Sequence, residues 1–347
     1  MNSFAWIRLS CLLVLWLSPG LVLAEPSPDQ RGPQHSAEAN SAEHRPQPGD
    51  GELQTLRFQP DWFPNAQFSG FFWAQVDGLY AAQGLDIDFA PFSFGNDFLG
   101  AVASGEAAFG TTEAYIFLNA IAKGAPLVAI GVVLRESPAG YIYLADGTIQ
   151  GPSDLANKRV GVHNYAERLL PFFTEQAGLG PDAAQAKAVQ HDMAVLLDGD
   201  VDLHQGYATD ELLRLAAMTD RPVDILLFER LGLPMYSMVI YTSRATLDQH
   251  PEWVDAFLTA SAEGWQRAMR SPNIAASVVN QEYPSDAVED AMVAAQATAL
   301  KRFVLPDNEP VLSMSRSKWA AMQSAFLASG LIEESLDLDH MLYGARP

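Results

Sequence analysis

The chain alternates short apolar runs with stretches in which apolar residues recur every three or four positions. The run LDIDF, residues 85–89, alternates apolar and acidic residues and therefore predicts a half-buried strand. Before it, Phe72, Val76 and Tyr80 recur at helical spacing, and Gly84 ends the predicted helix. This order of a helix followed by a strand continues for most of the next 150 residues.

Strands that alternate with helices predict an α/β fold with mostly parallel sheets. The phrase AVASGEAAFGTTEA has a later echo in AVLLDGDVDLHQGYATDEL, which indicates two lobes of related design. Residues 235–243 predict a strand that crosses back to the first lobe, and the chain after it is nearly all helix. We therefore expect lobe one to comprise residues 53–145 and 236–347, with helices at its C-terminal end. Lobe two comprises residues 146–235.

The N-terminal region has the pattern of a secretory signal peptide. Arg8 precedes an apolar run too short and too interrupted to span a bilayer, and LVLA supplies small residues for cleavage after residue 24. Residues 25–52 are rich in Pro, Gln, Ser and Glu and predict a disordered linker. The only cysteine, Cys11, lies within the predicted leader, so the mature chain would contain neither disulfides nor thiolate ligands.

Acidic residues outnumber basic ones twofold. The 42 Asp and Glu against 21 Lys and Arg give a formal net charge of −21. Such a surface repels phosphate backbones, so a nucleic-acid partner is not expected.

Several polar turns follow predicted strands and should meet at one cleft, because ligands of α/β sheets bind beyond the carboxyl ends of the strands. In the turn DWFPN, Trp62 and Phe63 are suited to stacking on a flat ring, and Asn65 offers a donor and an acceptor. A packing cluster between the lobes would account for the two aromatic residues equally well.

Four other turns supply further candidates for ligand binding. A carboxylate opposite an aromatic slot suits an amino-substituted heterocycle, although Asn and Glu at helix starts also act as ordinary caps. The candidates in these turns are Asn96, Thr112, Glu113, Tyr165, Tyr207 and Glu211.

The sequence gives little support for a metal site, a cofactor or catalysis. His163, His191 and His204 invite a metal interpretation, but predicted elements separate the last two. We find no nucleophile elbow, no phosphate-binding loop and no dinucleotide fingerprint. We therefore expect that the protein binds neither a metal nor a cofactor and that it is not an enzyme.

The stretch DWFPNAQFSGFFWAQVDGLYAAQGLDIDF resembles the thiamine-pyrimidine precursor family of periplasmic binding proteins. The segments AVASGEAAFG, SDLANKRVGV and GDVDLHQGYATDE add to the resemblance, which covers about residues 56–269. The family is related to the fungal pyrimidine synthase and to sulfonate- and nitrate-binding components of importers.

The resemblance implies a two-lobed type II periplasmic binding fold that delivers a small ligand to an ABC permease, acting as a monomer in the periplasm. It implies that Trp62 and Asn65 form an aromatic-amide pocket and that Tyr207 and Glu211 approach from the second lobe. A sensor subunit for a membrane receptor, or a ligand such as riboflavin or a sulfonate, are the alternatives. The chain departs from many relatives at Phe68, where they have His, and it lacks the Cys-rich motif of the fungal synthase.

Overall fold

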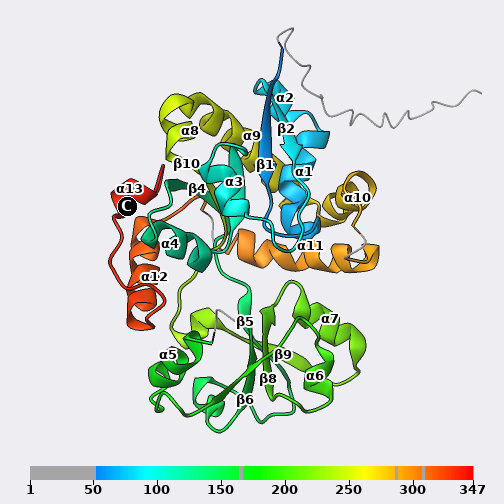
Figure 1. Cartoon of the computed structure of the whole chain (residues 1–347). Helices are drawn as coiled ribbons and strands as arrows, with labels where there is room; N and C mark the ends of the chain where they lie inside the picture. Colours follow the sequence, from blue (N-terminus) through cyan, green and yellow to red (C-terminus); the bar gives the residue numbers. More distant parts are fainter. Residues whose placement is uncertain (1–51, 164–166, 286–287, 307–308, 347) are drawn as a thin grey trace, which may run out of the picture. The chain divides into compact units, whose positions relative to one another are not determined.

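The computed structural model describes residues 52–163, 167–285, 288–306 and 309–346. The predicted signal peptide and nearly all of the predicted linker lie outside these ranges. Figure 1 shows two sheets with helices packed around them. None of the helices in the described ranges is long and apolar enough to cross a membrane.

The first sheet has the strand order β2-β1-β3-β10-β4. β1 is parallel to β2 and β3, with Leu56 opposite Ile87, whereas β10 is antiparallel to both β3 and β4. The alternation in LDIDF holds, because Leu85 and Ile87 are buried and Asp88 is exposed. The bounds of these strands are β1 Gln54–Gln59, β2 Leu85–Phe89, β3 Phe109–Thr112, β4 Leu127–Leu134 and β10 Ser237–Ser243.

The second sheet repeats this plan in the order β7-β6-β8-β5-β9. β6 is parallel to β7 and β8, and β5 is antiparallel to β8 and β9. Each sheet is therefore mixed but mostly parallel, with one reversed strand, as the sequence predicts. The bounds are β5 Ala139–Leu144, β6 Arg159–Val162, β7 Gln185–Ala188, β8 Leu203–Tyr207 and β9 Val223–Leu227.

Two strands of the second sheet differ from the sequence analysis. β5 belongs to this sheet. The expected lobe boundary after residue 145 would have placed β5 in lobe one. An apolar run predicts a strand but does not indicate which sheet the strand joins. β7 has four exposed residues and an edge position, so it carries no apolar pattern that would have revealed it.

The helices flank the sheets, and the C-terminal region is helical as expected (Figure 1). The helix predicted before β2 is in fact two helices, because Gly78 adopts a left-handed conformation with φ of 71° between them. The helices are η1 Ala66–Phe68, α1 Ser69–Val76, α2 Leu79–Ala82, α3 Phe98–Ala103, α4 Ala114–Ala122, η2 Pro152–Leu155, α5 Leu169–Gln176, α6 Ala194–Leu197, α7 Glu211–Met218, η3 Phe228–Leu231, α8 Arg244–Gln249, α9 Pro251–Arg270, α10 Pro272–Glu282, α11 Asp290–Val304, α12 Arg316–Ala328 and α13 Leu338–Met341.

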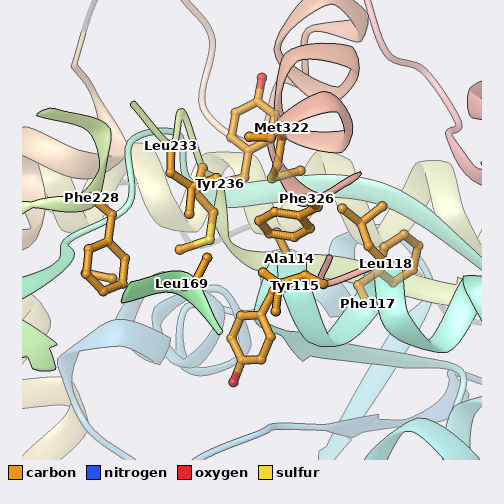
Figure 2. Packing of buried hydrophobic residues seen from close by; sticks show 14 of the residues in the cluster. Ala114, Tyr115, Phe117, Leu118, Leu169, Phe228, Leu233, Tyr236, Met322 and Phe326 are labelled. Carbon is orange, nitrogen blue, oxygen red and sulfur yellow. The ribbon is translucent and has the colours of Figure 1, made fainter. Parts of the chain in front are cut away.

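The buried apolar side chains join elements that are far apart in the sequence. Figure 2 shows one cluster, to which Phe117 of α4, Leu169 of α5, Phe228 of η3 and Phe326 of α12 contribute. A second cluster packs α1, α9, α10 and α11 around the first sheet. The chain that returns after lobe two thus completes the core of lobe one.

α1 and α9 approach each other most closely where two glycines face one another. A Cβ atom at Gly264 would lie 2.1 Å from the carbonyl oxygen of Gly70, and one at Gly70 would lie 2.2 Å from the indole of Trp265. Neither glycine has a positive φ, so backbone conformation does not require glycine at these positions. The close approach of the two helices does.

We expect Gly264→Ala to destabilise the protein by about 1–3 kcal/mol, since the added methyl group forces two helix backbones apart. Chemical denaturation monitored by circular dichroism would measure this change. Gly180→Ala is the matched control, because a Cβ there meets nothing within 4 Å. Equal stability of the two variants would contradict the packing argument.

Candidate functional site

A cavity of about 290 Å³ lies at the carboxyl ends of the parallel strands of both sheets. Its wall includes residues that follow β1, β2, β3, β6, β7 and β8, which is where the topology of α/β sheets places a ligand site. The lining residues are Asp61, Trp62, Asn65, Gln67, Phe92, Phe98, Glu113, Tyr115, Ile116, His163, His191, Gln205, Gly206, Tyr207, Thr209, Asp210, Glu211, Met238, Gln296 and Leu300.

One wall of the cavity is aromatic. The ring of Trp62 lies 5.8 Å from that of Phe63, 5.5 Å from that of Phe92 and 5.7 Å from that of Phe94. It also lies 5.6 Å from the imidazole of His191, which comes from the second sheet's side of the cavity. These contacts fix the indole while leaving part of it on the cavity wall.

Asn65 holds the turn after β1 in place. It caps η1, and its side-chain oxygen accepts a hydrogen bond of 2.8 Å from the backbone N–H of Gln67. The residue is 4% exposed and lines the cavity. Its amide is therefore pre-positioned by the same cap that starts the helix.

Two carboxyl groups lie on the first sheet's side of the cavity. Asp61 accepts a 2.8 Å hydrogen bond from the hydroxyl of Thr111, yet burial raises its pKa to about 6. Burial raises the pKa of Glu113 to about 7, and the charge of Asp61 adds to this effect. The side chains of Tyr207 and Ser237 oppose the shift. Near neutral pH, Glu113 is therefore poised to exchange a proton, whereas Asp61 exchanges its proton at lower pH.

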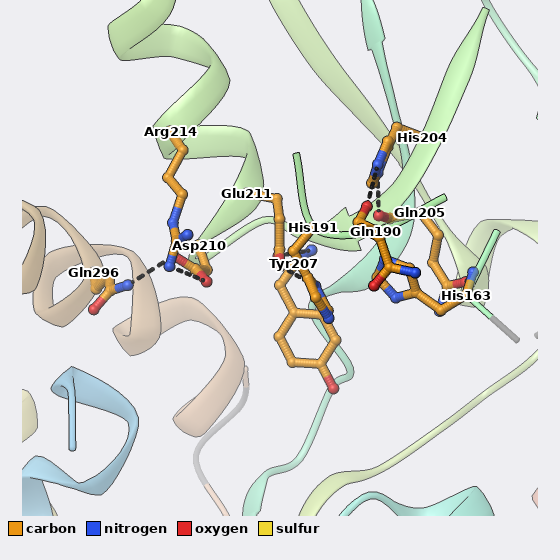
Figure 3. Close-up of polar contacts among 10 residues, drawn as sticks. All are labelled: His163, Gln190, His191, His204, Gln205, Tyr207, Asp210, Glu211, Arg214 and Gln296. Atoms are coloured by element: carbon orange, nitrogen blue, oxygen red, sulfur yellow. Dashed lines mark hydrogen bonds and ion pairs between the residues drawn. The ribbon is translucent and has the colours of Figure 1, made fainter. Parts of the chain in front are cut away.

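Two more carboxyl groups, from the second sheet's side, are held by protein partners (Figure 3). Glu211 accepts a 2.9 Å hydrogen bond from the backbone N–H of Tyr207, and its other oxygen lies 3.5 Å from Nδ1 of His191. Burial opposes ionisation of Glu211, but these two partners outweigh it and hold the pKa below its ordinary value. Glu211 is thus an ionised group that positions Tyr207 and His191.

Asp210 is paired by two elements. Arg214 donates to both carboxylate oxygens, at 2.8 and 3.1 Å, and Gln296 of α11 donates at 2.9 Å. Burial, followed by the neighbouring charge of Glu211, nevertheless raises the pKa of Asp210 to about 6. The Gln296 contact ties the C-terminal helices to the loop after β8.

The histidines that invite a metal interpretation do come together, but as a packed group. The ring of His163 lies 4.3 Å from that of His191 and 5.8 Å from that of His204. Both ring nitrogens of His204 face carbonyl oxygens, of Gln205 at 2.5 Å and of Gln190 at 3.0 Å (Figure 3). Within the described residues, no group of three or more His, Cys, Asp or Glu is arranged to hold a metal ion.

Burial determines the charge of His163, another member of this group of histidines. Burial lowers the pKa of His163 to about 4, so the imidazole is neutral at physiological pH.

The acidic residues before His204 form ion pairs at the surface. Asp202 pairs with Arg159 at 2.8 Å, and Asp200 lies 3.9 Å from Lys187.

The structure brings most of the predicted site residues to the cavity. Five of them line it: Trp62, Asn65, Glu113, Tyr207 and Glu211. Their contact with a ligand stays a prediction.

Three other predicted residues, Phe63, Thr112 and Asn96, do not line the cavity. Phe63 belongs to the aromatic cluster beside Trp62, and Thr112 is buried at the end of β3. Asn96 lies in an exposed loop, where Ser93 donates to its side-chain oxygen at 2.6 Å. Tyr165 lies outside the described residues.

Phe68, where the resemblance implies a departure from the family pattern, does not line the cavity. It is 1% exposed and packs 6.1 Å from the ring of Phe72 within the core of lobe one.

Sequence reasoning missed several lining residues, notably Asp61, Phe92 and Gln296. Asp61 follows β1 in the same turn as Trp62, and Phe92 follows β2 in the same turn as Asn96, so their position after a strand was the available signal. Gln296 carries no such signal, because it lies within a helix that reaches the cavity only through the return of the chain.

Comparison with known proteins places the chain among relatives of two kinds. The family model described as "NMT1/THI5 like" matches residues 65–275, which is more than half of the chain. The chain is 25% identical over 237 residues to the formylaminopyrimidine-binding protein of Halalkalibacterium halodurans, covering 66% of this chain and 71% of the relative. It is 22% identical over 304 residues to the riboflavin-binding protein RibY of Chloroflexus aurantiacus, covering 82% and 84%.

A third relative is named as an enzyme. The chain is 24% identical over 229 residues to a 4-amino-5-hydroxymethyl-2-methylpyrimidine phosphate synthase of Legionella pneumophila, covering 65% of this chain and 72% of the relative. Among solved structures, the aliphatic sulphonate-binding protein SsuA of Escherichia coli matches with a TM-score of 0.65 and 17% identity, covering 83% of this chain and 97% of SsuA. This confirms the two-lobed periplasmic-binding fold.

The raised pKa of Glu113 predicts a pH-dependent stability. A carboxyl whose pKa rises on folding from 4.5 to about 7 binds more protons in the folded state, so its contribution to stability falls as pH rises through this interval. Glu113→Gln removes this titration. We expect the variant to gain about 1–3 kcal/mol relative to the wild type between pH 4.5 and pH 8.

Urea denaturation of the unliganded protein at several pH values would measure the difference. Glu334→Gln, at an exposed position, is the control and should follow the wild type. A Glu113→Gln curve parallel to the wild type would refute the burial argument.

Proposed function

Since the chain belongs to the NMT1/THI5-like family, we propose that it is a periplasmic solute-binding protein for a small planar heterocycle. In this role the two lobes close on the ligand and the complex is delivered to the permease of an ABC importer. A thiamine-pyrimidine precursor is the leading ligand, since one relative is named a formylaminopyrimidine-binding protein.

The chemistry of the cavity wall is the observation that carries the proposal. The indole of Trp62 offers a flat apolar surface, and four carboxyl groups are among the other lining residues, whereas no Lys or Arg appears among the described lining residues. Such a site suits a ring with N–H donors and opposes sulfonate, nitrate or phosphate groups.

Binding, rather than synthesis of a pyrimidine, is the proposed activity. Phe68, where the resemblance implies a departure from the family pattern, is buried, and the only cysteine of the chain is Cys11. The polar groups that line the cavity are suited to hold a ligand by hydrogen bonds, and those among the described residues include no nucleophile paired with a base.

A panel of ligands tests the class. Thermal unfolding of the mature protein should shift upward with hydroxymethylpyrimidine or formylaminopyrimidine, because a ligand at 100 times its Kd adds about 2.7 kcal/mol. Thiamine, riboflavin, taurine and nitrate complete the panel. A shift with taurine or nitrate alone would contradict the proposal, and so would formation of a product from any bound pyrimidine.

Trp62→Ala tests the aromatic wall. The substitution removes the stacking surface, so we expect the Kd for the bound pyrimidine to rise at least tenfold. Isothermal titration calorimetry would give the Kd, and the thermal midpoint of the unliganded variant would show that it folds.

Trp253→Ala is the matched control for this substitution. Its ring stacks 3.6 Å from that of His250, and the residue does not line the cavity. Similar affinities in Trp62→Ala and Trp253→Ala would remove Trp62 from the site.

A further inference from the structure

Of the four carboxyl groups in the cavity, Glu113 stands apart because one of its oxygens is unpaired. The Oε2 atom of Glu113 is buried and has no hydrogen-bond partner among the described residues. Asp61 receives the hydroxyl of Thr111, and both Asp210 and Glu211 receive protein donors. A buried polar atom without a partner is costly unless a ligand satisfies it.

Burial and the like charge of Asp61, after β1, disfavour the ionised form of Glu113. The hydroxyls of Tyr207 and Ser237 and the backbone of Met238 act in the opposite direction but do not outweigh burial. Across the cavity, Asp210 is paired with Arg214, and Glu211 lies 3.5 Å from Nδ1 of His191. No Lys or Arg lines the cavity within the described ranges, so no fixed cation is available to hold Glu113 as a carboxylate.

A protonated carboxyl group has one donor and one acceptor side by side. This pair matches a heterocycle in which a ring nitrogen lies next to an exocyclic amino group: the acid O–H donates to the ring nitrogen, and the carbonyl oxygen accepts from the amino group. An ionised carboxylate accepts at both positions and would meet the lone pair of the ring nitrogen.

We propose that Glu113, in its neutral form, is the residue that selects the ligand, by pairing with the ring-nitrogen and amino edge of an aminopyrimidine-type heterocycle. The proposal rests on the function proposed above and adds to it the class of ligand and a dependence on pH. The proton stays with the Glu113–ligand pair, so binding above the pKa of the free site takes up one proton from solvent.

Affinity as a function of pH tests the proposal. For the wild type, the Kd of hydroxymethylpyrimidine should rise up to tenfold per pH unit above about pH 7, reaching roughly a hundredfold at pH 9. Calorimetry at pH 8.5 in buffers of different ionisation enthalpy should detect the uptake of about one proton per ligand. Asp61 remains ionised throughout this interval, and His163 remains neutral.

Two substitutions distinguish a neutral from an ionised Glu113. The amide of Glu113→Gln keeps one donor and one acceptor, so its Kd at pH 6.5 should stay within about threefold of the wild type and should not change up to pH 9. Glu113→Ala should raise the Kd at least tenfold. The 4-methoxy analogue of hydroxymethylpyrimidine, which lacks the amino donors, should bind the wild type at least tenfold more weakly.

The failures of the two proposals are separable. If Trp62→Ala abolishes binding of the pyrimidine while Glu113→Ala leaves it unchanged, the binding function stands and the role of Glu113 falls. The role of Glu113 also falls if wild-type affinity is constant or increases from pH 7 to pH 9, or if Glu113→Gln binds as poorly as Glu113→Ala. If no aminopyrimidine binds at all, the binding function and this inference fall together.

Discussion

The common direction of the strands is the constraint on which the rest of the structure depends. In each sheet four strands run one way and a single strand, β10 or β5, runs against them. The turns that follow these co-directional strands all emerge at one edge of the sheet. Their backbone groups and polar side chains do not take part in the hydrogen bonds of the sheet. Both lobes therefore present their polar turns to the same cavity, although residues that line it are more than 200 positions apart in the chain.

Carboxyl groups that are buried together in one cavity need hydrogen-bond or ion-pair partners, or they become protonated. The four carboxyl groups of this cavity differ in this respect. Arg214 and Gln296 hold Asp210, while His191 and the backbone of Tyr207 hold Glu211. On the other wall, a single hydroxyl reaches Asp61, and burial keeps its pKa high. Both carboxyl groups on the second lobe's side thus have protein donors, whereas on the first lobe's side Glu113 keeps one buried oxygen without a partner among the described residues.

The sequence predicted the fold well because the decisive signals are local. The period-two run 85–89 and the predicted crossing strand 235–243 both correspond to strands of the first sheet. The sequence could not predict the edge strand β7, whose residues are all exposed, or the membership of β5, which depends on pairing with β8 and β9. The first failure reflects the absence of an apolar pattern, and the second reflects pairing, about which periodicity carries no information.

The same distinction applies to the site. Trp62 and Glu113 were predicted because each stands in a turn directly after a strand. Gln296 could not be predicted, because only the return of the chain brings α11 to the loop that carries Asp210. Contacts that cross between the lobes are properties of the assembled fold, so the residues that make them have no signature in their own segments.

The two readings of the aromatic turn, a ligand wall and a packing cluster, describe the same arrangement. Phe63, Phe92 and Phe94 surround the indole of Trp62 with tilted or edge contacts, and Phe94 remains 72% exposed. A side chain held on several sides loses little further freedom when a ring stacks on it, so less of the interaction energy is spent on ordering it. The aromatic cluster therefore holds the free face of Trp62 in one orientation. The contact with His191 adds a constraint on the indole from the second lobe.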